Sequence, residues 1–259
     1  MTSNEKCIWL IKKLISENDQ YCDLEIPENA HEQRQLLRAL MNVRRAIPIS
    51  EEFLKIQNEY LQEIVREKGV TDISELNSLE NGIYLWQGDI TTLRCDAIVN
   101  AANSGMTGCY APCHGCIDNC IHTYAGVQLR LECDKIMRKQ GYAEPTGKAK
   151  ITGAYNLPCK YVLHTVGPII RGKVREKDIQ LLASCYTSCL KLADENRLNS
   201  IAFCCISTGE FHFPNQLAAE IAGQTVRDYK RATNSKIEVA FNVFKDVDYE
   251  IYRKLLGQH

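Results

Sequence analysis

Residues 99–126 read VNAANSGMTGCYAPCHGCIDNCIHTYAG and join an apolar run to a helical pattern. The run at 97–99 opens into small polar residues, as a buried parallel strand does where it enters a ligand-binding loop. From Asp118 onward apolar residues recur every three or four positions, which predicts a helix over about 118–139 that Asp118 caps. The loop therefore lies where open α/β sheets bind ligands, between a strand end and a helix start.

This loop carries residues of the types that bind zinc. Cys109, His114 and Cys116 follow the spacing C-x4-H-x-C, and Cys113 is a fourth thiol between them. Thiolate and imidazole are ligands that zinc prefers, and three protein ligands leave a tetrahedral position open for water or substrate. The spacing differs from that of zinc fingers and ribbons, whose ligand pairs stand far apart. Ligand chemistry favours zinc over the alternative of ordinary cysteines in a cysteine-rich chain.

Composition indicates an ordinary globular protein. The chain has 259 residues, 45% of them hydrophobic, and a formal net charge of -1 with scattered basic residues, so we expect no nucleic-acid partner. Thirteen cysteines, an odd number with five crowded into 109–133, argue against a disulfide framework. No stretch resembles a signal peptide or a membrane span, so we expect a reduced, cytoplasmic protein without a membrane partner.

Along the chain, a helical region precedes an alternating one. Residues 1–75 carry three amphipathic patterns, the third starting after Ser50 and ending at Gly69, and predict a helical N-terminal extension. Residues 76–259 alternate strands and helices, which predicts an α/β domain with a largely parallel sheet. The predicted strands are 83–86, 97–99, 151–154, 161–166, 201–206 and 237–243, and the later helices are 177–196, 214–232 and 247–256.

Two further loops follow predicted strands. Gly88 and Asp89 follow the first, where an acid can accept hydrogen bonds from an adenine amino group or a ribose hydroxyl, although an Asp in a turn or helix cap is commoner. Residues 207–214 follow the strand at 201–206. Small residues that lead into a helix expose backbone N–H groups suited to a diphosphate, but one glycine falls far short of a P-loop.

Five segments together resemble a macrodomain, the ADP-ribose-binding module, over about residues 75–259. They are Gly88-Asp89-Ile90, Asn100-Ala101-Ala102-Asn103, residues 118–126, His164-Thr165-Val166-Gly167-Pro168 and Ser207-Thr208-Gly209. The resemblance implies a three-layer α/β/α fold with a mixed, mostly parallel sheet that holds ADP-ribose in a cleft. It implies that Asp89, with Ile90, contacts adenine and that Asn103 lies at the distal ribose. The loop implied to wrap the diphosphate is Ser207, Thr208, Gly209, Glu210 and Phe211.

Residues 117–126 fall in register with the Val-Asp-Gly-x-Ile-His-Arg-Ala-Ala-Gly segment of hydrolytic MacroD-type members. Here the glycine run before that segment is replaced by 109–116, as in the zinc-dependent macrodomains of bacteria and fungi. These are found beside a class of sirtuin ADP-ribosyltransferases and a lipoyl-carrier protein of the glycine-cleavage H type, and carry a helical extension that residues 1–75 would match. By this resemblance Cys109, His114 and Cys116 bind Zn²⁺.

The resemblance implies a zinc-dependent ADP-ribosylhydrolase that removes mono-ADP-ribose from a modified protein side chain. Asp118 would orient or deprotonate the attacking water, with His122 as a candidate partner and Asn103 at the ribose. The implied partners are ADP-ribose and a mono-ADP-ribosylated protein such as the lipoyl carrier.

Two alternatives stay open. A non-catalytic reader of ADP-ribose would have a structural zinc, which normally takes four ligands, so Cys113 as a fourth ligand would favour it. A cysteine-nucleophile hydrolase would use Cys109 or Cys116 with His114, but nothing in the sequence sets one cysteine apart from its neighbours.

Overall fold

A sheet of seven strands forms the core of the part of the chain that the computed structural model describes, residues 1–257. Its strands are β2 (Ser78–Glu80), β3 (Ile83–Gln87), β5 (Ala97–Ala101), β6 (Ala149–Gly153), β7 (Tyr161–Thr165), β8 (Ser200–Phe203) and β9 (Glu238–Val243). They lie in the order β2-β3-β9-β8-β5-β7-β6, and a short pair, β1 (Thr71–Asp72) with β4 (Leu93–Arg94), stands apart. Only the edge strands β2 and β6 run antiparallel to their neighbours among the described residues. The predicted mixed, mostly parallel sheet is confirmed.

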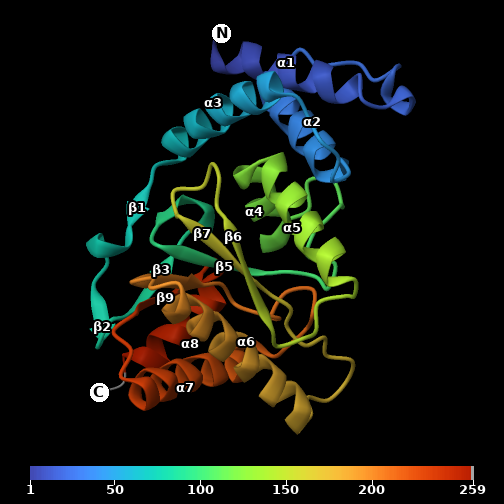
Figure 1. The fold of residues 1–259 in the computed structure, drawn as a ribbon. Helices are drawn as coiled ribbons and strands as arrows, with labels where there is room; N and C mark the ends of the chain where they lie inside the picture. The colour runs from blue at the N-terminus through green and yellow to red at the C-terminus, as the bar shows by residue number, and fades with distance from the viewer. Residues whose placement is uncertain (258–259) are drawn as a thin grey trace.

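Helices cover both faces of this sheet. They are α4 (Ile117–Ala125), α5 (Val127–Gln140), α6 (Glu176–Glu195), α7 (Asn215–Thr233) and α8 (Asp246–Leu256). In Figure 1, α4 and α5 lie on one side of the sheet, and α6, α7 and α8 lie on the other. Apolar side chains of the central strands are fully buried between the two helical layers, as in an α/β/α fold. The predicted three-layer architecture is confirmed.

The helix predicted over 118–139 is two helices. The helix is interrupted at Gly126, which has a φ of +96°. This conformation favours glycine because glycine has no Cβ. A Cβ there would also lie 2.6 Å from Oε1 of Gln128 and 2.7 Å from Nε2 of Gln57. The break lets α4 and α5 take different directions, so that α4 ends against the N-terminal helices.

The N-terminal residues form α1 (Ser3–Ile15), α2 (Ala30–Val43) and α3 (Glu51–Lys68), with a 3-10 turn at Asp19–Tyr21 after α1. Two more 3-10 turns follow later in the chain, at Ile73–Glu75 and Ile90–Thr92. As predicted, Ser50 caps α3 by accepting a hydrogen bond from the N–H of Phe53, and the helix ends at Gly69. The three helices share an apolar cluster of their own, which Val127 of α5 joins. Figure 1 shows them at the top, coloured from blue to blue-green, above α4 and α5. The division of the chain at residue 75 stays a prediction.

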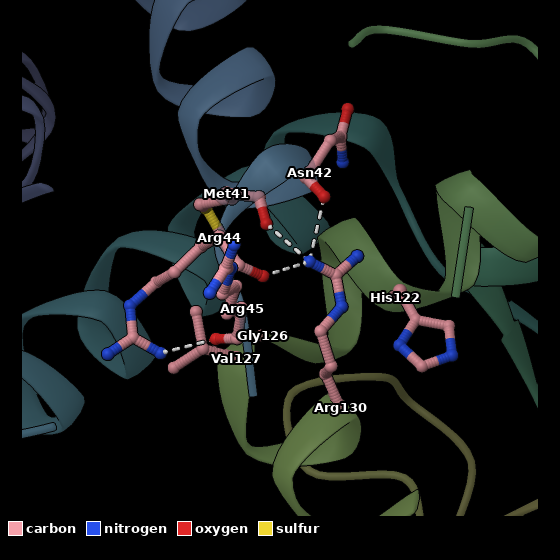
Figure 2. Close-up of a pocket in the computed structure, with 8 residues that line it drawn as sticks. All are labelled: Met41, Asn42, Arg44, Arg45, His122, Gly126, Val127 and Arg130. Atoms are coloured by element: carbon pink, nitrogen blue, oxygen red, sulfur yellow. Dashed lines mark hydrogen bonds between the residues drawn. The ribbon is translucent and has the colours of Figure 1, made fainter. Parts of the chain in front are cut away.

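Arg130 of α5 fastens these helices to the rest of the molecule. Its guanidinium donates to the carbonyls of Met41, Asn42 and Arg44 at the C-terminal end of α2 (Figure 2). Carbonyls at a helix C-terminus lack intrahelical hydrogen-bond donors and carry partial negative charge. A buried guanidinium there supplies both the donors and the opposite charge. Arg130 also donates to the carbonyl of Thr107, in the loop after β5. One side chain thus joins α2, α5 and the loop that precedes the cysteines.

Candidate functional site

A cleft of about 950 Å³ opens at the carboxyl ends of β3, β5, β8 and β9. Parallel strands end at the same edge of a sheet, so loops that are far apart in sequence meet there. Predicted site residues on its wall are Asp89, Ile90, Asn103, Cys109, His114, Cys116, Asp118, Ser207, Thr208, Gly209, Glu210 and Phe211. The structure thus gathers these residues around one cavity, while their individual roles stay predictions.

Asp118 is a buried carboxylate held by two amides. Its Oδ1 accepts a hydrogen bond from Nδ2 of Asn100 at 2.8 Å, and its Oδ2 accepts one from Nδ2 of Asn103 at 3.1 Å. The residue is 4% exposed, and burial raises the pKa of its carboxyl to about 6. The prediction that Asp118 caps its helix is wrong. Cys116 is the N-cap, with its Sγ accepting from the N–H of Asn119, because the Asp118 side chain is drawn inward by the two asparagines.

Asn100, which sequence reasoning assigned no role, links Asp118 to the sheet. Its Nδ2 lies 3.1 Å from Nδ1 of His164, and Nε2 of His164 lies 2.9 Å from Oγ1 of Thr152. Since the amide donates, Nδ1 of His164 is the acceptor and Nε2 carries the hydrogen. Burial lowers the pKa of His164 to about 3, so the ring is neutral near pH 7. The strand residue Asn100 is thereby fixed in one orientation beneath the carboxylate.

His122 lies one helical turn after Asp118, as predicted, but does not line the cleft. Its Nε2 is 3.6 Å from Oδ1 of Asp118, which is longer than a hydrogen bond, and neither ring nitrogen has a partner within residues 1–257. Burial lowers the pKa of His122 well below its usual value, which keeps the ring neutral. A Cβ on Gly108 would lie 2.8 Å from this ring, so the histidine also shapes the loop after β5.

Cys109, His114 and Cys116 form a group whose ligand atoms all lie within 4.8 Å of one another. Sγ of Cys109 is 3.8 Å from Nδ1 of His114. These separations suit ligands that surround one tetrahedral ion with bonds of about 2.0–2.3 Å. Nε2 of His114 faces Oε1 of Glu210 at 3.7 Å, across the mouth of the cleft. Histidine ligands commonly turn their second ring nitrogen toward a carboxylate in this way.

Cys113 does not belong to this group. Its backbone has a φ of +53°, and its Sγ donates to the carbonyl of Gln35 in α2 at 3.4 Å. Its N–H donates to Oδ1 of Asn42, also in α2, at 2.9 Å. Arg38 of the same helix donates to the carbonyl of His114 at 2.8 Å. The N-terminal helices therefore hold the cysteine loop, a role that no local sequence pattern indicated.

The loop after β8 closes another wall of the cleft. Ser207 adopts a φ of +66°, and its buried Oγ has no partner within residues 1–257. A Cβ on Gly167 would lie 2.0 Å from that Oγ, so only glycine permits the two loops to approach. The carbonyl of Phe211 accepts a hydrogen bond from the N–H of Ile170. Residues 207–211 thus present a tight turn next to the loop after β7.

Asp89 lies at the end of the cleft formed by β3. Its Oδ1 accepts hydrogen bonds from the N–H and the hydroxyl of Thr91, so it caps the 3-10 turn at Ile90–Thr92. Its Oδ2 lies 2.7 Å from Nζ of Lys68, the last residue of α3. The turn cap is therefore confirmed, and the contact of Asp89 with adenine stays a prediction for a residue that lies on the cleft wall.

Comparison with known proteins agrees with this geometry. A family model described as "Macro domain" matches residues 99–222. A "Protein-ADP-ribose hydrolase" of Treponema medium is 59% identical over 261 residues, which cover 99% of this chain and 100% of that protein. The chain belongs to the macro domain family. A "Protein-ADP-ribose hydrolase" of Staphylococcus aureus (strain MSSA476) is 51% identical to this macro domain chain, over 96% of it and 94% of the relative.

Solved macrodomains share the fold. The Trypanosoma brucei macrodomain in complex with ADP-ribose is 30% identical, with a TM-score of 0.66, and the match covers 85% of this chain and 95% of that one. The Oceanobacillus iheyensis macrodomain with ADP is 34% identical, with a TM-score of 0.63, over 70% of this chain and 93% of that one. In the described part of this macro domain protein, no helix is both long and apolar enough to cross a membrane.

Proposed function

We propose that the chain is a hydrolase that releases mono-ADP-ribose from modified protein side chains with the help of a bound Zn²⁺. The observation that carries the proposal is one cleft whose wall contains both the buried carboxylate of Asp118 and the group Cys109, His114 and Cys116. Sequence identities of 59% and 51% with proteins named "Protein-ADP-ribose hydrolase", over 99% and 96% of this chain, support hydrolysis of ADP-ribosylated protein as the reaction class.

The cleft offers ADP-ribose a polar contact at each end and backbone donors between them. Asp89 at the β3 end accepts from the adenine amino group, as its position on the cleft wall allows. The turn at 207–211 faces the diphosphate with backbone N–H groups, which bind anions well. Asn103 and Asp118 lie together at the other end, where the distal ribose and its bond to the protein would then be placed.

The donor set fits zinc. Two thiolates and one imidazole would hold the ion, and the approach of their ligand atoms to within 4.8 Å needs little rearrangement. Bound Zn²⁺ would act as a Lewis acid toward ribose hydroxyls or water at its open position. Arg38 and Asn42 of α2 keep the loop in this ligating shape through their contacts with His114 and Cys113.

Asp118 is suited to orient a water molecule and to take its proton. Asn100 and Asn103 bind one carboxylate oxygen each, which leaves a second lone pair on each oxygen available for a further donor. Their hydrogen bonds stabilise the ionised form and fix the direction of the carboxylate. Water oriented there would attack the ribose carbon bonded to the side chain, and the bond from that carbon to the side chain would break. The side chain would leave and take up a proton, and the product with the new hydroxyl would be free ADP-ribose.

The reader with a structural zinc is less well supported. Structural zinc sites normally have four protein ligands. Cys113, the candidate fourth ligand, instead donates hydrogen bonds to residues of α2 through both its Sγ and its N–H. A set of three ligands beside a buried carboxylate favours catalysis.

The test measures metal content together with release of ADP-ribose from a mono-ADP-ribosylated protein. We expect about one zinc per chain in the parent protein, loss of both metal and turnover in Cys116→Ala, and loss of turnover with metal kept in Asp118→Asn. Cys113→Ala is the matched control in the same loop and should keep zinc. A parent protein that binds ADP-ribose but cleaves no acceptor would be a reader. Full turnover after zinc removal would support a cysteine nucleophile instead.

We further propose that the modified acceptor is a lipoyl-carrier protein of the glycine-cleavage H type that a sirtuin-type transferase has ADP-ribosylated. The support is the likeness of the loop at 109–116 and of the N-terminal helices to the zinc-dependent macrodomains. Comparison of kcat/KM on the modified carrier with that on unrelated proteins modified at the same residue types tests it, and equal values would exclude the carrier as the preferred substrate.

The thirteen unpaired cysteines support a cytoplasmic location.

A further inference from the structure

The C-terminal end of α3 reaches the β3 end of the cleft. Lys68, its last residue, places Nζ 2.7 Å from Oδ2 of Asp89 and 3.4 Å from the centre of the Tyr124 ring. A lysine over an aromatic face is attracted by the electron-rich ring, and here it is also paired with a carboxylate. The N-terminal helices therefore place a cation beside a site that is otherwise formed by strand-end loops, α4 and the start of α8.

The two carboxylate oxygens of Asp89 have different partners. Oδ1 accepts from the N–H of Thr91 at 3.0 Å and from its hydroxyl at 2.6 Å, so both of its lone pairs are engaged. Oδ2 accepts from Lys68, which leaves one lone pair for a donor in the cleft. Lys68 thus determines which lone pair a ligand can use. It also favours the ionised carboxylate, and Lys68 and Thr91 hold the pKa of Asp89 below its usual value despite burial.

Tyr124 limits the movement of Lys68. The tyrosine lies on α4, and its side chain separates the cleft from a second groove of about 390 Å³ between α2 and α3. A lysine side chain has many rotamers, and holding one of them costs entropy that the ring contact and the ion pair offset. Because the Lys68 side chain is only 27% exposed and the Asp89 side chain 36%, this ion pair is screened less than one on the open surface.

We propose that Lys68 is a positioning residue for the nucleobase subsite: it orients the Asp89 carboxylate so that the cleft prefers a base with an exocyclic amino group over one with a carbonyl in its place. The inference rests on the proposed function, in which Asp89 contacts adenine. In this arrangement a function of the N-terminal helices is to set base selectivity in a cleft built by the following domain.

The experiment measures, by calorimetry on the full chain, the binding of ADP-ribose and of its hypoxanthine analogue, in which a carbonyl replaces the adenine amino group. We expect the parent to prefer ADP-ribose by about tenfold or more, the effect of one hydrogen bond to a charged acceptor. Lys68→Met should reduce this preference about threefold or more, and Lys68→Arg should largely retain it. Lys55→Met changes another lysine of α3, which is exposed, and should leave the preference unchanged.

A double variant separates positioning from a general structural effect. In an Asp89→Asn background the preference is already reduced, so Lys68→Met should reduce it no further. The inference would be overturned if Lys68→Met reduced the preference for ADP-ribose equally in the parent and in the Asp89→Asn background. It would also be overturned if Lys68→Met left the preference unchanged or increased it. A parent protein that binds both nucleotides equally would overturn it and leave the hydrolase proposal standing. A parent protein that binds neither would refute the proposed function itself.

Discussion

Asn42 of α2 gives the sharpest test of how the N-terminal helices support the cysteine loop. The residue is 1% exposed, and its side chain makes two hydrogen bonds of 2.9 Å: Oδ1 accepts from the N–H of Cys113, and Nδ2 donates to Oγ1 of Thr123. Asn42→Ala removes both and leaves the Cys113 N–H without its acceptor. An unpaired polar group of this kind costs about 1–3 kcal/mol, so we expect a loss of about 2–3 kcal/mol in the free energy of unfolding.

That loss has two measurable consequences. For a chain of this size it corresponds to a decrease in Tm of about 4–12 °C, which scanning calorimetry measures. The loop at 109–116 also loses an anchor, so zinc affinity, measured by competition with a chelating dye, should fall about tenfold or more, as when other supporting contacts of metal ligands are removed. Asn4→Ala, an exposed asparagine of α1, is the matched control. A lower Tm with unchanged zinc affinity would show that the loop keeps its shape without α2 and would refute the reasoning.

Three further predictions concern stability and ligand binding. Burial lowers the pKa of His164 to about 3 from about 6.5. Between these pH values the unfolded chain binds a proton on this ring and the folded chain does not. Lowering the pH therefore reduces the free energy of unfolding by up to about 1.4 kcal/mol per pH unit. Urea unfolding from pH 6.5 to 4.5 should show a steeper loss of stability for the parent than for His164→Gln. Gly167→Ala, whose Cβ would lie 2.0 Å from Oγ of Ser207, should weaken ADP-ribose binding at least about tenfold by calorimetry, whereas Gly153→Ala, with no close contact, should not. Arg130→Leu should lower the free energy of unfolding by about 3 kcal/mol in denaturant titration and speed proteolysis within residues 1–50, since two carbonyls of α2 and that of its C-cap Arg44 lose their donor.

Six strands and the later helices were predictable because each has a strong local period. The short strands β1, β2 and β4 were not predicted, and the strand predicted over 201–206 ends at Phe203. The predicted strand at 83–86 is observed at Ile83–Gln87, and the helix predicted at 177–196 is observed at Glu176–Glu195. The errors arose where a contact from a distant segment overrides a local signal. Gly126 breaks the predicted helix at a point crowded by Gln57 and Asn156, and Asp118 turns from a cap position toward the asparagines of β5 and its loop.

The candidate site was partly visible in the sequence for the same reason. Cys109, His114 and Cys116 lie within eight residues, and the loops that carry Asp89 and Ser207 each follow a recognisable strand. A parallel sheet brings strand ends to one edge, so their gathering around one cleft follows from the fold class.

The sequence by itself determined the layered α/β architecture, the presence of an N-terminal helical region and the residue types that meet at the strand ends, since all of these depend on local periodicity and spacing. Only the tertiary structure decided that Cys113 is bound by α2, that Asn100 holds Asp118 and that Lys68 faces Asp89. The contact between Asn42 and Cys113 joins residues 71 positions apart. Periodicity indicates which face of an element is buried, but not which distant side chain it meets there, and packing alone settles that.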